Sequence, residues 1–102
     1  MLRETLNVLI IDEVKKFIDS LPEQERAKLA AAIASLINRN FETVHIKTLR
    51  NYLKELIIKK RRYIFCIENS TIYFLRAFTK KTAKTPPTEI KAATEIYKRL
   101  MK

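Results

Sequence analysis

Basic and aromatic residues are interleaved in the second half of this 102-residue sequence, and such side chains can act on a phosphate group. Four consecutive basic residues occupy positions 59–62, Arg76 interrupts an apolar run, and further lysines follow from Lys80. RNA carries its own nucleophile, the 2′-hydroxyl. A protein that aligns this hydroxyl and stabilises the charge developing on the adjacent phosphate can accelerate cleavage with Lys, Arg and Tyr alone. The pattern predicts a surface for a phosphate-bearing polymer.

The position of Arg76 decides how far this surface extends. Simple strand alternation places Arg76 on one face with the large apolar residues Ile72, Phe74 and Phe78. If that face is open, Arg76 joins residues 59–62 in a concave basic surface. The alternative is an ion pair with an acid such as Glu55 on an adjacent strand. The aromatic residues of the same runs either stack on unpaired bases or form core.

The net charge of +10 is concentrated in one region. Residues 1–40 hold six basic and six acidic residues, whereas residues 41–102 hold fifteen basic and five acidic residues. Between Lys47 and Lys84 there are eleven basic residues against Glu55 and Glu68. Because the excess is regional, we favour a polyanionic partner over a basic surface that only aids solubility.

The composition excludes several kinds of site. The sequence has no glycine, so it lacks the glycine-rich loops that cradle phosphates. One cysteine, Cys66, and one histidine, His45, cannot build a disulfide or a zinc site, and we expect neither metal nor cofactor. We expect His45 in a surface connection. No apolar stretch is long enough to span a membrane and no signal-peptide pattern is present, so we expect one cytoplasmic domain, residues 1–102, with no membrane partner.

The spacing of apolar residues predicts two helices in the first half. A short strand covers residues 5–9 and a helix covers residues 11–20. A second helix follows a capping box at residues 20–23, with proline tolerated in its first turn. The second helix buries one apolar stripe, which consists of Leu29, Ile33, Leu36 and Ile37.

The second half has the composition of strands. Residues 53–59, 62–67 and 71–79 are rich in Ile, Phe, Tyr and Leu. Asn69 suits a hairpin turn because it tolerates positive φ, and Pro86 and Pro87 begin a last helix. The order β-α-α-β-β-β-α predicts an α+β domain, with helices against one face of a small, mainly antiparallel sheet.

Several segments resemble the phage-type HigB branch of the RelE/ParE toxin superfamily. Phe17–Pro22 is similar to the corner between that family's two helices, and Tyr52–Leu56 and Arg62–Cys66 are similar to two of its strands. The most specific segment is Ile72–Pro86, which contains the run Lys-Lys-Thr-x-Lys-Thr-Pro. Ile57 and Tyr63 stand where the family often has arginine.

The resemblance implies a RelE/ParE-like fold and the toxin of a type II toxin–antitoxin system. Such a toxin cleaves mRNA on the translating ribosome and is neutralised by a HigA-like helix-turn-helix antitoxin. The candidate catalytic residues are then Arg61, Arg62 and Arg76, which would stabilise phosphate charge, and Tyr63, which would orient the attack unless Tyr73 does so. The candidate RNA-binding residues are Lys59, Lys60, Lys80, Lys81, Lys84 and Tyr73.

Two other functions fit the same pattern. A ParE-like protein shares the fold and poisons DNA gyrase without nuclease chemistry. A non-catalytic module would use its basic half only to hold phosphates.

Overall fold

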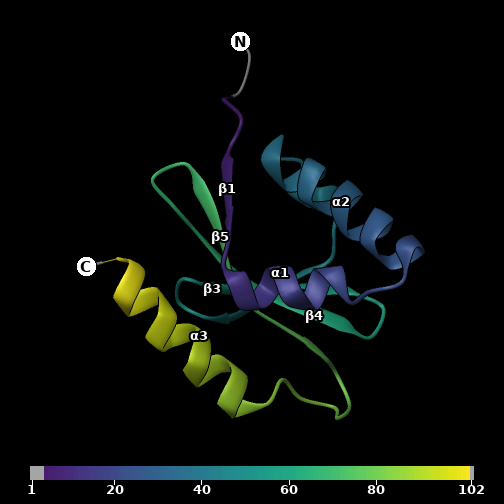
Figure 1. Ribbon diagram of the computed structural model, residues 1–102. Coiled ribbons are helices and arrows are strands. Elements are labelled where there is room, and N and C mark those ends of the chain that lie inside the picture. The colour runs from purple at the N-terminus through teal and green to yellow at the C-terminus, as the bar shows by residue number, and fades with distance from the viewer. Residues whose placement is uncertain (1–3, 102) are drawn as a thin grey trace.

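The computed structural model describes residues 4–101, and in that range the chain forms three α-helices and a five-stranded sheet (Figure 1). The helices are α1 (Asp12–Asp19), α2 (Glu23–Ile37) and α3 (Pro87–Leu100), and a 3-10 turn, η1, covers Phe41–Thr43. The strands are β1 (Asn7–Ile10), β2 (Ile46–Arg50), β3 (Leu53–Ile58), β4 (Arg61–Glu68) and β5 (Thr71–Thr79).

The order of the strands in the sheet is β1-β5-β4-β3-β2. All neighbouring strands are antiparallel except β1 and β5, which are parallel. The predicted α+β class is confirmed.

Helices cover both faces of the sheet, so the expectation that they share one face is wrong (Figure 1). The central strand β4 explains the difference, because its residues are buried on both sides. Tyr63 and Phe65 belong to the core under α1 and α2, whereas Ile64 and Cys66 belong to a second core that includes Ala93 of α3. A strand that is apolar on both faces needs a cover on each.

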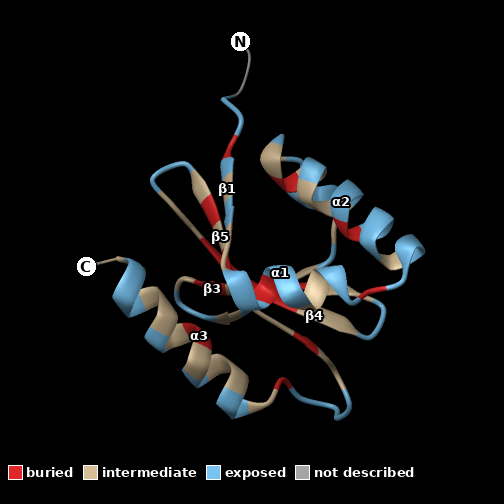
Figure 2. Cartoon of the chain, in the orientation of Figure 1, coloured by how far each residue is buried: buried red, intermediate tan, exposed pale blue. Residues whose placement is uncertain are grey.

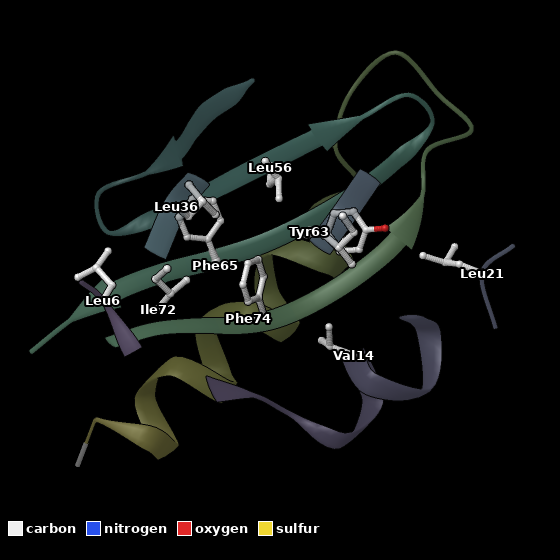
Figure 3. Packing of buried hydrophobic residues seen from close by; sticks show 10 residues of the cluster. Leu6, Val14, Leu21, Leu36, Leu56, Tyr63, Phe65, Ile72 and Phe74 are labelled. Atoms are coloured by element: carbon white, nitrogen blue, oxygen red, sulfur yellow. The ribbon is translucent and has the colours of Figure 1, made fainter. Parts of the chain in front are cut away.

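The larger core lies between the sheet and the first two helices. Val14 of α1 and Leu29 and Leu36 of α2 are buried there, as the predicted stripe of α2 requires. Their side chains pack on a layer of strand residues that includes Phe65 and Phe74 (Figure 3). The outer surfaces of the helices are exposed, which gives each helix one buried and one solvated side (Figure 2).

An additional edge strand, β2, occupies residues that the sequence assigned to a connection. Its five residues, Ile46–Arg50, do not alternate regularly between apolar and polar side chains, and all of them are half-buried or exposed. The sequence signal is weak because an edge strand pairs on one side only, here with β3. His45 is exposed directly before this strand, as expected for a surface residue.

A β-bulge in β5 changes which side Arg76 faces. Ile64 pairs with Arg76 but Phe65 pairs with Phe74, so Leu75 is an extra residue in β5. Simple alternation therefore fails after Phe74. Arg76 shares a face with its partner Ile64, on the side covered by α3, and does not share a face with Phe74. The prediction that Arg76 shares a face with Ile72 and Phe74 is wrong for this reason, whereas Phe78 does lie on the same side as Arg76.

Tight turns form without glycine. Asn69 and Ser70 in the β4–β5 hairpin have φ of 49° and 63°, so the turn predicted at Asn69 is confirmed. Lys59, between β3 and β4, has φ of 55°, a conformation that costs a residue with a Cβ some free energy. The β3–β4 turn is thus held by the sheet and not by a turn-forming residue.

The helix starts agree only in part with the prediction. The α2 helix begins at Glu23 after Pro22, but no side chain caps it, and the Ser20 hydroxyl donates to the Phe17 carbonyl. The predicted capping box does not form. The α3 helix begins at Pro87, as expected from proline's fixed φ. Among the described residues, no helix is long and apolar enough to cross a membrane.

Candidate nucleic-acid interface

Two segments that are distant in the sequence meet at one end of the sheet. The backbone amide of Lys80 donates to the carbonyl oxygen of Lys60 at 2.7 Å, which joins the start of the loop after β5 to the β3–β4 turn. We call the cations of these two segments the basic end: Lys59, Lys60, Arg61, Arg62, Lys80, Lys81 and Lys84. The candidate basic residues of the sequence analysis, apart from Arg76, lie in these two segments.

Most of the basic end is open to solvent. Lys59, Lys60, Lys81 and Lys84 are exposed. Lys28 of α2 adds a cation that the sequence analysis missed, because helix α2 looked like scaffold. Proximity of the Lys59 ammonium lowers the pKa of Lys28 from its usual value. Crowded like charges of this kind favour a polyanionic partner, which relieves their repulsion.

Arg61 is half-buried and forms an ion pair with an acid that the sequence analysis did not single out, Glu25. Its guanidinium donates to both carboxylate oxygens of Glu25, at 2.9 and 3.2 Å, and also to the Thr79 hydroxyl. It lies 5.9 Å from the centre of the Phe17 ring. The hydrogen bond from Arg61 lowers the pKa of Glu25. Arg61 therefore ties β4 to α2, and its charge is largely neutralised within the fold.

Arg62 points to the other side of the sheet. It pairs with Phe78, which packs in the core beneath α3. One of its terminal nitrogens donates to the carbonyl oxygens of Lys59 and Arg61, so Arg62 stabilises the strained β3–β4 turn. No salt bridge neutralises Arg62 among the described residues, and its buried Nε has no hydrogen-bond partner there. Its positive charge is available to a ligand.

The two tyrosines do not lie on an open surface with these cations. Tyr63 is 1% exposed, and its ring packs edge-on against Phe17 with centroids 5.9 Å apart. Burial raises the pKa of Tyr63 to about 12. Its hydroxyl points toward the edge of the core near Leu21 (Figure 3). Tyr73 is half-buried against the core on the α3 side. The structure thus places both tyrosines in the packing of the domain.

Arg76 lies between two helices and not in the basic end. Its Nε donates to Glu89 of α3 at 2.8 Å, and a terminal nitrogen donates to Glu13 of α1 at 3.0 Å. The hydrogen bond to Glu89 contributes most to raising the pKa of Arg76. An open sheet face, on which Arg76 would extend the basic surface, does not exist because α3 covers it. The alternative of an ion pair is therefore confirmed in kind, but the partners are Glu89 and Glu13 on helices and not Glu55 on a strand.

The described residues offer no set of metal ligands. In residues 4–101 no three His, Cys, Asp or Glu side chains gather in a group that could hold a metal ion. Cys66 is buried, and this burial raises the pKa of its thiol to about 11, so it is an inert core residue. The chemistry that the basic end supports is the binding and charge stabilisation of phosphates by Lys and Arg.

The fold belongs to a recognised class of small α+β proteins. A chain of the toxin–antitoxin complex RelBE2 from Mycobacterium tuberculosis matches with a TM-score of 0.51 and 18% sequence identity, covering 74% of this chain and 99% of that chain. The predicted RelE/ParE-like fold is confirmed.

Residues 16–98 match the family described as phage derived protein Gp49-like, and the chain belongs to that family. No match is found among the curated proteins.

Proposed function

We propose that this protein is the toxin of a type II toxin–antitoxin system and that it cleaves mRNA on the ribosome, in the cytoplasm. The observation that carries the proposal is the basic end, where two segments with few acidic residues present exposed cations together. A RelE-like fold and membership of a phage-derived family support it. RNA is the substrate that fits, because its 2′-hydroxyl supplies the nucleophile that this surface lacks.

The protein's part in the reaction is to bind and to stabilise charge. The 2′-hydroxyl loses its proton to water while its oxygen forms a bond to the adjacent phosphorus. The bond from phosphorus to the 5′-oxygen breaks, and the leaving oxygen takes a proton from water, so the products are a 2′,3′-cyclic phosphate and a free 5′-hydroxyl. Negative charge grows on the phosphate and on the leaving oxygen. Arg62 and the lysines of the basic end would stabilise that charge. Arg61 would act as a positioning residue, because its guanidinium is already bound to Glu25.

The partner we propose is a helix-turn-helix antitoxin of the HigA type. The structural match to a chain of a toxin–antitoxin complex supports an antitoxin in general. The exposed cations of the basic end would attract an acidic segment of such a partner. Co-purification with the product of a neighbouring gene would test this assignment.

Purified protein mixed with ribosomes programmed with mRNA tests the activity. We expect cuts within the translated frame, mapped by primer extension, and none without ribosomes. The Arg62→Ala variant should lose cleavage by about 10²-fold or more, as for other groups that stabilise developing charge. Intact mRNA with the folded wild-type protein would reject the nuclease. Gyrase-dependent DNA breaks on expression, with mRNA intact, would instead identify a ParE-like poison.

A second candidate is a protein that binds RNA without cutting it. The observation that favours it is the location of three candidate catalytic side chains: Arg61 and Arg76 are ion-paired, and Tyr63 is buried. Salt-sensitive RNA binding, together with harmless expression and uncut mRNA, would establish this function.

A further inference from the structure

A buried pair, Glu55 and Thr85, lies beneath the lysine-rich loop of the basic end. Glu55, on β3, has no exposed surface, and Thr85, at the end of the loop, is 8% exposed. The Thr85 hydroxyl donates to Oε2 of Glu55 at 2.7 Å. The pairing joins residues that lie 30 positions apart in the sequence.

We refer to residues 80–85 as the strap, and the described contacts fix it at both ends. At its start, the Lys80 amide donates to the Lys60 carbonyl at 2.7 Å. At its end, Thr85 is held by Glu55. Between these points the Thr82 hydroxyl donates to the carbonyl of Lys84 at 2.9 Å. Lys81 and Lys84 are exposed, so a backbone that is held at both ends presents cations to solvent.

Stability alone does not account for the carboxylate at position 55. Oε1 of Glu55 is buried and has no hydrogen-bond partner among the described residues. A buried carboxylate with so few partners costs free energy that an apolar residue of similar size would avoid. Glu55 sits between Ile64 of β4 and Lys47 of β2, on the side of the sheet that faces α3, and no salt bridge to Lys47 forms among the described residues.

We propose that Glu55 and Thr85 are positioning residues that fix the strap so that Lys81 and Lys84 meet the RNA backbone together. The inference rests on the proposed function and adds to it residues that do not touch the substrate. The physical reason is preorganisation: a loop that is already ordered loses less conformational entropy on binding. Without the Thr85–Glu55 hydrogen bond, the end of the strap that carries Lys84 would lose its side-chain attachment to β3, while the start would stay bound to the β3–β4 turn through Lys80.

The test compares Thr85→Val, which removes the hydroxyl at nearly constant volume, with Thr85→Ser, which keeps it. Trypsin cleavage between Lys81 and Thr82, followed by mass spectrometry, reports on the order of the strap without any RNA. We expect it to become about tenfold faster in Thr85→Val and to stay within about twofold in Thr85→Ser. Circular dichroism establishes that each variant is folded. If Thr85→Val fails to fold, Glu55→Met with Thr85→Val removes both polar partners and takes its place.

Binding of a short single-stranded RNA then tests the positioning. Affinity falls with salt, so the slope of log affinity against log salt is negative. In Thr85→Val this slope should become less steep by about 1.4, the value for two lost phosphate contacts. A general loss of stability would not change this slope in a folded protein. In a background of Lys81→Ala and Lys84→Ala, the Thr85→Val change should alter RNA affinity by less than about twofold, because it acts through these lysines.

The trypsin measurement and the RNA-binding measurement test different parts of the proposal. Unchanged trypsin cleavage in Thr85→Val would reject the fixed strap. Faster cleavage with an unchanged salt slope would reject the role in RNA contact. A wild-type protein that neither binds nor cuts RNA would reject the proposed function, while the trypsin measurement would still decide whether Glu55 and Thr85 fix the strap.

Discussion

Arg62 and Arg76 lie on neighbouring strands and face the same side of the sheet, but they differ in what surrounds them. Arg76 is held between Glu13 and Glu89, and its charge is neutralised where α1 and α3 approach each other. The Arg62 guanidinium donates to backbone carbonyls at the β3–β4 turn, and no salt bridge among the described residues neutralises its charge. Arg76 joins two helices to the sheet, whereas Arg62 belongs to the basic end.

The difference shows that a basic residue in a charged sequence region is not necessarily part of a basic surface. Glu13 precedes Arg76 by 63 residues, so local composition gives no sign of this neutralisation. At the basic end the helices supply Glu25, which neutralises Arg61, and also Lys28, which adds charge. The electrostatic potential of a surface depends on which helix residues the fold brings to it.

The largest expected effect is on RNA affinity, and it distinguishes the basic end from basic residues elsewhere in the protein. Lys60→Ala with Lys81→Ala should weaken binding of single-stranded RNA by on the order of tenfold to 10²-fold at low salt, because phosphate contacts are lost. The matched control is Lys91→Ala with Lys98→Ala, which removes two exposed cations from α3. Binding measured by fluorescence anisotropy should differ clearly between the pairs. Equal losses would mean that net charge, and not the basic end, governs binding.

Replacing Arg76 should affect stability and not RNA binding. Arg76→Met leaves two carboxylates without their partner, and we expect a loss of about 1–2 kcal/mol in the free energy of unfolding. Urea denaturation measures it. Glu89, at 21% side-chain exposure, should matter more than Glu13, at 73%, when each is changed to Gln. A loss of RNA affinity in folded Arg76→Met would contradict this and show that Arg76 is part of the RNA-binding surface.

The Glu25–Arg61 pair should make stability depend on pH in the acid range. Because Arg61 lowers the pKa of Glu25 in the folded protein, the carboxylate contributes stability above its unfolded pKa near 4.5. That contribution is lost as the pH falls through the lowered folded-state value. Thermal unfolding should show Glu25→Gln less stable than wild type at pH 7, with the difference shrinking below about pH 4.5. A constant difference across this range would show that the charge of Glu25 is unimportant.

The smallest effect concerns repulsion within the basic end. The ammonium of Lys59 lowers the pKa of Lys28, so Lys59→Gln should raise it toward its ordinary value. Titration of the Lys28 side chain by NMR measures the shift. Saturating RNA should also raise the Lys28 pKa in wild type, because phosphates offset the repulsion. No shift in Lys59→Gln would place Lys28 outside the basic end.

Much of the fold could be predicted from local patterns. Helix positions followed from apolar spacing in α2, and the β4–β5 turn followed from Asn69, since both depend on neighbours in the chain. The strand β2 and the second covered face were missed. An edge strand has a weak pattern, and the side that a helix covers depends on how the chain returns after β5.

The candidate site could likewise be predicted only in part from local patterns. The sequence by itself determined that Lys59, Lys60, Lys80, Lys81 and Lys84 are cations in segments with few acids, because charge is a property of the residue. Only the tertiary structure decided which charges stay free. One extra residue in β5 turned Arg76 toward α3, and packing of α2 brought Glu25 to Arg61. Burial and pairing depend on contacts between residues far apart in the sequence, so they cannot be read from the order of residues alone.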